Sequence, residues 1–224
     1  MPEPPPRFFI SYVHHSAEDN RLVEKFFLDL CNDVQVFSSK DDGTGFCDTS
    51  LQLGDRWSDG LVEALSTAQV FLPLLSPSYF RSEACGKEWT VFESRIAPAG
   101  RSTSIIPLLW VPMDTLHPVA DRYQYREAAF GDEYERVRLR RLIRGAQAVY
   151  NDFVQVLAQR VVELSTGRPV PPATDRPGFH QIASAFAATR RPPTAVPPRP
   201  RNRAPRPPRR DLPLLNPNLP EDQR

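Results

Sequence analysis

The sequence predicts an α/β domain with a parallel central sheet covered by helices on both faces, followed by a proline- and arginine-rich tail. Three nearly continuous apolar runs, at residues 8–13, 69–75 and 105–111, show no polar alternation. Strands of this kind are buried on both faces of a parallel sheet. Segments with helical spacing of apolar residues separate the runs, which is the order expected of βαβ units. Such sheets bind ligands at the carboxyl ends of their strands, near a topological switch point.

The first half of the domain is predicted as strand, helix, short strand and helix. The strand at residues 8–13 is followed by apolar residues that share one helix face, namely Val23, Phe26, Phe27 and Leu30. Residues 32–45 are polar and glycine-containing, and they predict a connection of undefined structure that leads to a short strand near residues 46–48. Asp55 can cap a second helix that begins at Arg56.

The second half continues with the buried strand at residues 69–75. Ser76-Pro77 then favours a new helix over residues 79–95, with Ser82 as an internal N-cap. A third buried strand follows at residues 105–111. Further helix is expected between Gly131 and Gly145, without a defined place in the fold. Apolar residues at steps of three or four predict the last helix, namely Tyr150, Phe153, Leu157, Val161 and Leu164.

Proline and charge divide the chain into a body and a tail. Of the 25 prolines, 15 follow residue 168, and residues 1–168 carry a net charge of −5 against +6 for the remainder. The tail has too few apolar residues to offset the entropy of ordering it. We therefore predict a disordered N-terminus at residues 1–6, a domain at residues 7–166 and a disordered tail at residues 167–224.

The same composition restricts the partners. A mildly acidic body argues against a nucleic-acid-binding fold, and the arginine-rich part of the tail has no aromatic side chains for base stacking. The tail is either a solubilising terminus or a ligand for a proline-recognition domain or an acidic surface.

Cysteine usage and apolar runs indicate where the protein resides. Cys31, Cys47 and Cys85 are sparse and form no CxxC pair, which suits a reducing compartment. The first residues do not resemble a signal peptide, and no run approaches the ~20 apolar residues of a membrane span. We expect a soluble, cytoplasmic protein. The spacing of cysteine and histidine predicts no metal site, and neither GxGxxG nor GxxxxGK[ST] is present to hold a cofactor phosphate.

Three polar segments follow the predicted strands and carry the most specific patterns. They are FFISYVHHSAED, GFCDTSLQLGDRW and SPSYFRSEACGKEW. These segments resemble the bacterial type of Toll/interleukin receptor (TIR) domain, which typically shows F-[IL]-S-Y, then D…G-x-x-W across the BB loop, then S-x-x-[YF]-x-x-S-x-x-C-x-x-E-[WL]. The run VFLPLLSPSYFRSEACGKEW and the later LLWVP are similar to an actinobacterial TIR-like group labelled FxsC. The aspartate expected after F-I-S-Y is displaced to Asp19.

The resemblance implies a flavodoxin-like three-layer domain, the TIR fold, and an activity. Many TIR domains cleave the nicotinamide–ribose bond of NAD as N-glycosyl hydrolases, and some cyclise the product. Glu88 matches the catalytic glutamate. A carboxylate can stabilise the oxocarbenium-like cation that forms on the ribose, and nicotinamide leaves as a neutral group. NAD is then a substrate and no cofactor is needed. The other expected substrate-binding residues are Ser11, Tyr12, Asp48, Trp57 and Cys85.

Each of these residues also has an ordinary structural interpretation. A lone helix glutamate such as Glu88 is usually a solvated side chain. Trp57 could fasten its helix to the sheet, and Asp48 could cap the BB loop. Cys85 with His14 or His15 suggests a cysteine–histidine nucleophile, but this hypothesis is disfavoured because Cys85 matches a structural position of the family.

The resemblance also implies partners. TIR sites are often completed by head-to-tail assembly, in which the BB loop meets a neighbouring domain, so we expect activation by self-association with like or different TIR domains. The alternative function is a non-enzymatic TIR module that signals through protein–protein contacts alone.

Overall fold

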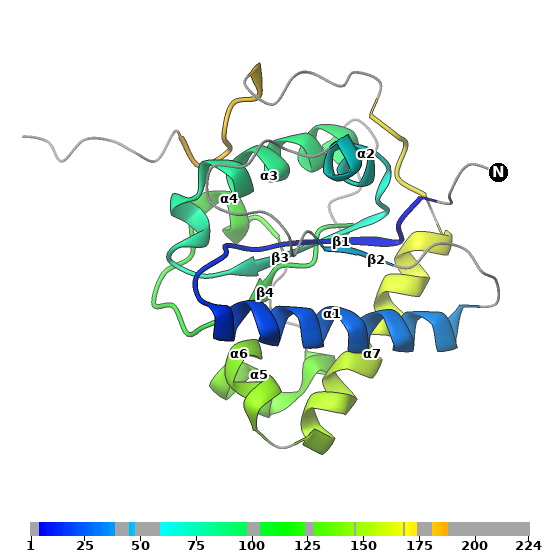
Figure 1. Ribbon diagram of the computed structural model, residues 1–224, viewed down its shortest axis with the longest axis vertical. Helices are drawn as coiled ribbons and strands as arrows, with labels where there is room; N and C mark the ends of the chain where they lie inside the picture. Colours follow the sequence, from blue (N-terminus) through cyan, green and yellow to red (C-terminus); the bar gives the residue numbers. More distant parts are fainter. Residues whose placement is uncertain are drawn as a thin grey trace, which may run out of the picture. The chain divides into compact units, whose positions relative to one another are not determined.

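Among the residues that the structure describes, four parallel strands form one sheet that lies between two layers of helices (Figure 1). The computed structural model describes residues 5–38, 45–47, 59–97, 104–123, 128–145, 147–167, 169–173 and 181–187. Within them the strand order is β2-β1-β3-β4, with β1 at Phe8–Ser11, β2 at Gly45–Cys47, β3 at Val70–Leu75 and β4 at Leu108–Leu109. The order reverses between β1 and β3, which creates the topological switch point of doubly wound folds. The predicted fold class is confirmed.

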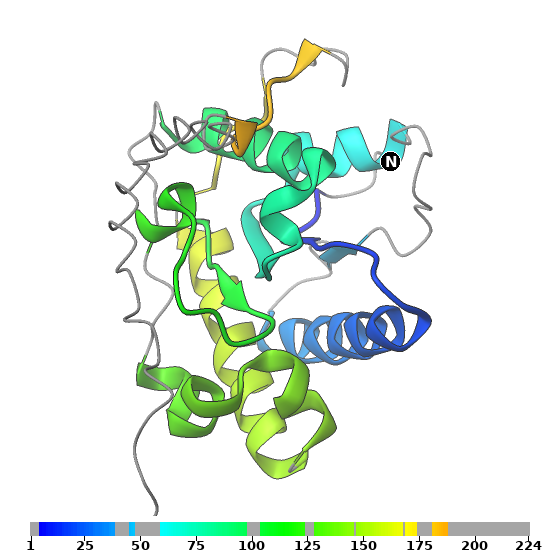
Figure 2. The same ribbon diagram turned by 90° about the vertical axis from the view of Figure 1, so that its left-hand side faces the viewer.

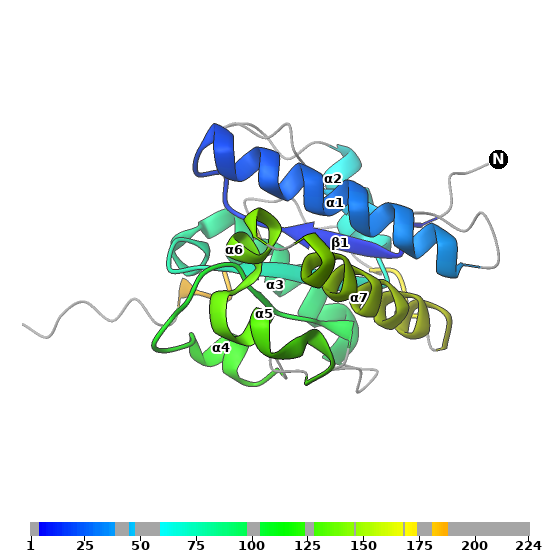
Figure 3. The ribbon, with the colours of Figure 1, turned by 90° about the horizontal axis from the view of Figure 1, so that it is seen from below.

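Helices cover both faces of this sheet. The long helices α1 (Ala17–Phe37) and α7 (Gln147–Gly167) lie side by side on one face (Figures 1 and 3). The helices α2 (Asp59–Thr67) and α3 (Glu83–Ile96) lie on the other face. The described residues also form the shorter helices η1 (Tyr79–Arg81), α4 (Pro118–Asp121), η4 (Ala128–Phe130), α5 (Gly131–Val137) and α6 (Leu139–Arg144).

The apolar core therefore has two halves, one on each side of the sheet. Successive side chains of a strand point to opposite faces. Phe8 and Ile10 of β1 accordingly pack towards α1 and α7, whereas Phe9 packs towards α2 and α3. On the second side Phe71 of β3 stacks on Phe92 with ring centroids 5.2 Å apart. Burial on both sides accounts for the unbroken apolar runs in the sequence.

Two elements differ from the sequence prediction. Helix α1 continues to Phe37, so the prediction of a connection from residue 32 was wrong for its first six positions. Val34 extends the buried stripe of α1 by one more turn, and that packing outweighs the polar residues around it. The strand predicted at residues 105–111 is regular only over Leu108–Leu109. Pro107 has no N–H to donate to a ladder, and Ile105 forms only an isolated bridge with Phe71.

The basic stretch at residues 136–144 covers the end of α5 and all of α6, and the two helices meet at Arg138. This residue has φ 67° and ψ 168°, a conformation that ends one helix and starts the next. Its guanidinium pairs with Glu135 at 3.0 Å. Arg140 and Arg144 reach the acidic first turn of α1, and the Nε of Arg140 lies 2.5 Å from Asp19. Much of this basic surface is thus paired with carboxylates.

Two segments after α7 lie against the body, although the sequence predicts that the domain ends at residue 166. In residues 169–173, Ala173 donates to the carbonyl of Ser66 at 3.0 Å, and the buried Arg95 donates to the carbonyl of Pro171 at 3.0 Å. Residues 181–187 contact α3. Most of the predicted tail, residues 188–224, lies outside the described residues. Over the described ranges, no helix is long and apolar enough to cross a membrane.

Candidate active site

The carboxyl end of β1 meets α3 at three buried polar side chains. Ser11 is the last residue of β1, Tyr79 lies in η1 and Glu88 lies in the second turn of α3. The Ser11 hydroxyl donates to Oε2 of Glu88, and its oxygen lies 2.9 Å from the Tyr79 hydroxyl. A serine has one proton to donate. Tyr79 must therefore donate to Ser11, which in turn donates to Glu88. We call this group the Ser11–Tyr79–Glu88 cluster.

The local sequence explains why these groups meet. Ser11 shares the α3-facing side of β1 with Phe9, because side chains alternate along a strand. Glu88 lies on the buried side of α3 with Cys85 and Phe92, at the spacing i, i+3 and i+7 from Cys85. Glu88 is only 6% exposed, so its carboxylate sits where water screens charge poorly. A carboxylate held in this way can stabilise a positive charge that develops nearby.

Burial also sets the protonation of the neighbouring groups. The pKa of Tyr79 lies well above its usual range because the hydroxyl is buried and because Cys85 and Glu88 are close by. Tyr79 thus keeps the proton that it donates to Ser11. Burial, with a smaller contribution from the Glu88 charge, also raises the pKa of the Cys85 thiol. The thiol donates to the backbone carbonyl of Tyr12 at 3.5 Å.

This arrangement argues against a cysteine–histidine nucleophile. The Nδ1 atom of His14 lies 3.4 Å from the hydroxyl of Tyr12, and the centroids of the two rings lie 4.5 Å apart. A buried thiol with a raised pKa is a poor nucleophile, since the thiolate is the reactive form. Cys85 is better described as part of the wall behind the cluster.

The raised pKa of Cys85 leads to a labelling prediction. In the folded chain at mildly alkaline pH, iodoacetamide should alkylate Cys85 more than about tenfold more slowly than in the unfolded chain, because each unit of raised pKa removes about tenfold of the thiolate. Cys47 is half-buried and serves as the internal control. Mass spectrometry of labelled peptides measures both rates. Equal alkylation of Cys85 in the folded and unfolded chains would contradict this protonation state.

Helix α3, which carries Glu88, begins at a side-chain cap. The N-cap is Ser82, as the sequence predicts, and its Oγ accepts from the amide of Cys85 at 3.2 Å. We expect Ser82→Ala to lower the free energy of unfolding by about 1 kcal/mol, because an amide of the first turn loses its partner. Urea unfolding measures the change. Ser94→Ala in the same helix is the matched control, and an equal loss there would show that capping is not the cause.

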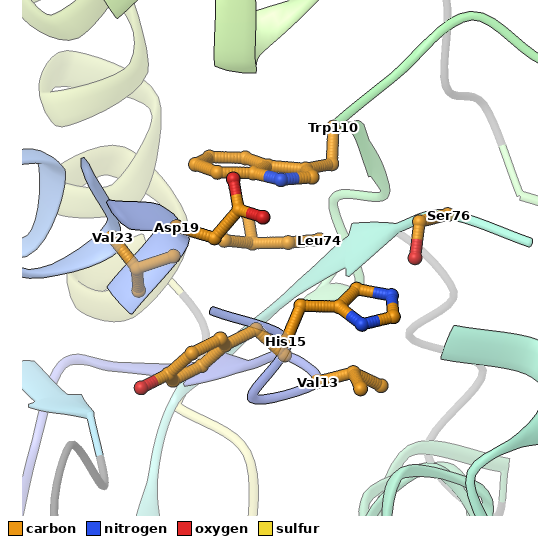
Figure 4. Close-up of a pocket in the computed structure, with 8 residues that line it drawn as sticks. Val13, His15, Asp19, Val23, Leu74, Ser76 and Trp110 are labelled. Atoms are coloured by element: carbon orange, nitrogen blue, oxygen red, sulfur yellow. The ribbon is translucent and has the colours of Figure 1, made fainter. Parts of the chain in front are cut away.

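A hollow opens at the same edge of the sheet, on the side of α1. It is lined by Tyr12, Val13, His15, Asp19, Val23, Leu74, Ser76 and Trp110. In Figure 4, Trp110 lies on one side of the hollow and His15 and Val13 lie on the opposite side. The empty volume of this hollow, including the part that is open to solvent, is about 260 Å³. Because part of this space is open solvent, the hollow by itself does not enclose a dinucleotide.

The structure brings some of the predicted site residues together. Ser11, Cys85 and Glu88 lie within one buried group, with Glu88 bonded to Ser11. Tyr12 lies on the opposite side of the sheet and lines the hollow. Asp48 and Trp57 lie outside the described residues, and their predicted roles remain predictions.

Sequence reasoning missed two residues at this edge. Tyr79 completes the cluster, and its signal was present as the tyrosine of the S-x-x-Y pattern. Asp19 was noted only as displaced, yet it lines the hollow and pairs with Arg140. Among the described residues, no group of histidine, cysteine and acidic side chains is suited to hold a metal ion.

The family model described as the TIR domain matches residues 8–143. The match covers more than half of the chain and includes β1, η1 and α3, the elements that form the cluster. The comparisons with curated proteins and with solved structures gave no match. The chain belongs to the TIR domain family, whose members act in signalling and defence.

Proposed function

We propose that this protein hydrolyses NAD at the nicotinamide–ribose bond, with Glu88 as the catalytic carboxylate. The observation that carries the proposal is the buried Glu88 carboxylate, held by Ser11 at the carboxyl end of β1. This end lies beside the switch point between β1 and β3, where doubly wound sheets bind ligands. The position of Glu88 in the S-x-x-Y-x-x-S-x-x-C-x-x-E-W segment also supports this assignment.

The chemistry requires little beyond a positioned carboxylate. When the bond from the ribose C1′ to nicotinamide breaks, its electron pair neutralises the positively charged pyridinium ring, and nicotinamide leaves without a proton. The cation left on the ribose is stabilised by the negative charge of Glu88. Water then adds to C1′ and loses a proton, which gives ADP-ribose. If a nucleophilic group of the same ADP-ribosyl cation adds to C1′ in place of water and loses a proton, the product is cyclic.

The cluster would keep the carboxylate in place during this reaction. Ser11 donates a hydrogen bond to one oxygen of Glu88, and Tyr79 in turn donates a hydrogen bond to Ser11. We further propose that Asp48 and Trp57 complete the substrate site, because Asp48 directly follows β2, whose carboxyl end lies at the same edge. Association between TIR domains would then enclose NAD and activate the enzyme.

The burial of Glu88 also supports the alternative function. A carboxylate that is 6% exposed and bonded to Ser11 can be purely structural, in which case the domain would act as a non-enzymatic interaction module. Under either function we propose a cytoplasmic location, since the three cysteines of the chain are sparse and form no CxxC pair. We also propose a proline-recognition domain or an acidic surface as the partner of the tail.

One experiment separates the two functions. The full chain is incubated with NAD, dilute and then clustered on a surface, and released nicotinamide is measured by chromatography. We expect little release from dilute protein, more on clustering, and none from clustered Glu88→Ala. The absence of release under every clustering condition would support the interaction module. Release that persists in Glu88→Ala would remove Glu88 from the active site.

A further inference from the structure

A short segment beyond the last long helix lies along the outer side of α3. Residues 181–187, here called the strap, are drawn in orange next to α3 in Figure 2. Ala185 of the strap donates its amide to the carbonyl of Gly86 at 3.0 Å. Thr90, one turn further along α3, donates its hydroxyl to the carbonyl of Ala183 at 2.7 Å. The strap is therefore bonded to two successive turns of the helix that carries Glu88.

The closeness of this contact depends on a glycine. A Cβ on Gly86 would lie 1.9 Å from the Ser184 hydroxyl oxygen and 3.0 Å from a ring carbon of Phe186. Glycine in the middle of a helix destabilises it relative to alanine, so the local propensity of α3 gives no reason for its presence. The space left by the missing side chain is filled by the strap.

An aromatic socket receives the end of the strap. Phe186 is 4% exposed, and its ring centroid lies 5.2–6.1 Å from those of the surrounding rings, which belong to Tyr79, Phe80, Trp89 and His117. Of these residues, Tyr79 also belongs to the cluster. A side chain that packs on the Tyr79 ring restricts where its hydroxyl can lie, and with it the positions of Ser11 and Glu88.

The strap does not cover the Glu88 carboxylate. Gly86 and Thr90 are each two residues from Glu88, which is about 200° around a helix. The strap thus bonds to the back of α3, while Glu88 points towards β1. We propose that Phe186 is a positioning residue that holds the Ser11–Tyr79–Glu88 cluster in place through the ring of Tyr79. The consequence for catalysis rests on the proposed NAD hydrolysis.

Hydrogen–deuterium exchange of the full chain tests the positioning without NAD. We expect Phe186→Ala to speed amide exchange on the order of tenfold in residues 79–88 and in the strap, while α1 and α7 exchange as in the wild type. Phe186→Leu, which refills the socket, should restore most of the protection. Unchanged exchange in residues 79–88 would overturn the proposal. Faster exchange throughout the domain would also overturn it, because Phe186 would then be an ordinary core residue.

A second pair of variants tests the contact between α3 and the strap. Gly86→Ala should displace the strap and reproduce the faster exchange of residues 79–88, although alanine favours the helix. Adding Ser184→Gly removes the side chain that the new methyl group would strike, and we expect it to restore protection. Gly167→Ala is the matched control, because an added Cβ there meets nothing within 4 Å. Faster exchange of the strap in Gly86→Ala with unchanged exchange in residues 79–88 would overturn the proposal.

The catalytic consequence is measured separately with clustered protein and NAD. We expect Phe186→Ala to lower kcat by about tenfold or more with little change in KM, because a misplaced carboxylate weakens the transition state rather than substrate binding. A normal kcat despite faster exchange of residues 79–88 would overturn the positioning role. If the wild type released no nicotinamide, the proposed function would fail, and the exchange results would still decide whether Phe186 positions the cluster.

Discussion

Glu88→Gln is expected to reduce nicotinamide release from clustered protein by about 100-fold to 1,000-fold. Glutamine keeps the length of the side chain and an oxygen that accepts from Ser11, so the buried contacts of the site survive. What it lacks is the negative charge that would stabilise the cation on the ribose. Removal of a single preorganised electrostatic group from an active site typically costs this much in kcat. Initial rates with saturating NAD measure the effect.

A second glutamate of α3 provides the matched control. Glu83 lies in the first turn of the helix, is largely exposed and pairs with Lys87 at 2.7 Å. Glu83→Gln makes the same chemical change without altering the cluster, and we expect it to leave the rate within about twofold, since the exposed Glu83 carboxylate is screened by solvent. If both variants lost activity equally, the charge of α3 as a whole would matter and Glu88 would have no special role.

The conservative substitution also tests the structural interpretation of Glu88. If the Glu88 carboxylate only supported the fold, its replacement by glutamine would change the free energy of unfolding and would have no specific effect on nicotinamide release. We expect Glu88→Gln to leave the free energy of unfolding nearly unchanged and to reduce nicotinamide release. The Ser11 hydroxyl keeps an acceptor in this variant, and no buried charge is left unpaired. Urea unfolding of both glutamate variants separates a loss of folded protein from a loss of chemistry.

Sequence reasoning could single out Ser11 and Glu88 because each depends on local signals. Ser11 follows a short apolar run, and Glu88 follows a serine that caps a helix, so both are tied to recognisable element boundaries. The contact between Ser11 and Tyr79 joins residues 68 positions apart and depends on the pairing of β1 with β3. No pattern within either segment contains that pairing, which explains why Tyr79 was not assigned a role.

The strap was missed for a related reason. Its sequence is surrounded by prolines and arginines, and a compositional reading assigns such a region to a tail. Phe186 is nevertheless buried, because aromatic rings from other parts of the chain surround it. Seven residues with one aromatic anchor cannot form a core, yet they can cover one. Composition measures what a segment can bury by itself and not what it can contact elsewhere.

The second large effect is expected at Gly45, the first residue of the edge strand β2. Gly45 pairs with Phe8 of β1, and a Cβ on it would lie 2.1–2.6 Å from three atoms at the tip of the Phe8 ring. That ring is fully buried and meets Phe27 of α1 with centroids 6.0 Å apart, so it cannot swing into solvent. We expect Gly45→Ala to lower the free energy of unfolding by about 3 kcal/mol, at the upper end of overpacking costs. Urea unfolding measures the loss.

A double-mutant cycle assigns this loss to the ring. Leucine at position 8 lacks the ring atoms that the new methyl group would strike, so Gly45→Ala should cost much less in the Phe8→Leu background than in the wild type. Gly167→Ala, whose added Cβ meets nothing within 4 Å, should leave stability nearly unchanged. Additive effects at positions 8 and 45 would contradict the expected contact. Strong coupling would show that β2 keeps a glycine so that the Phe8 ring can lie across the edge strand and pack against α1.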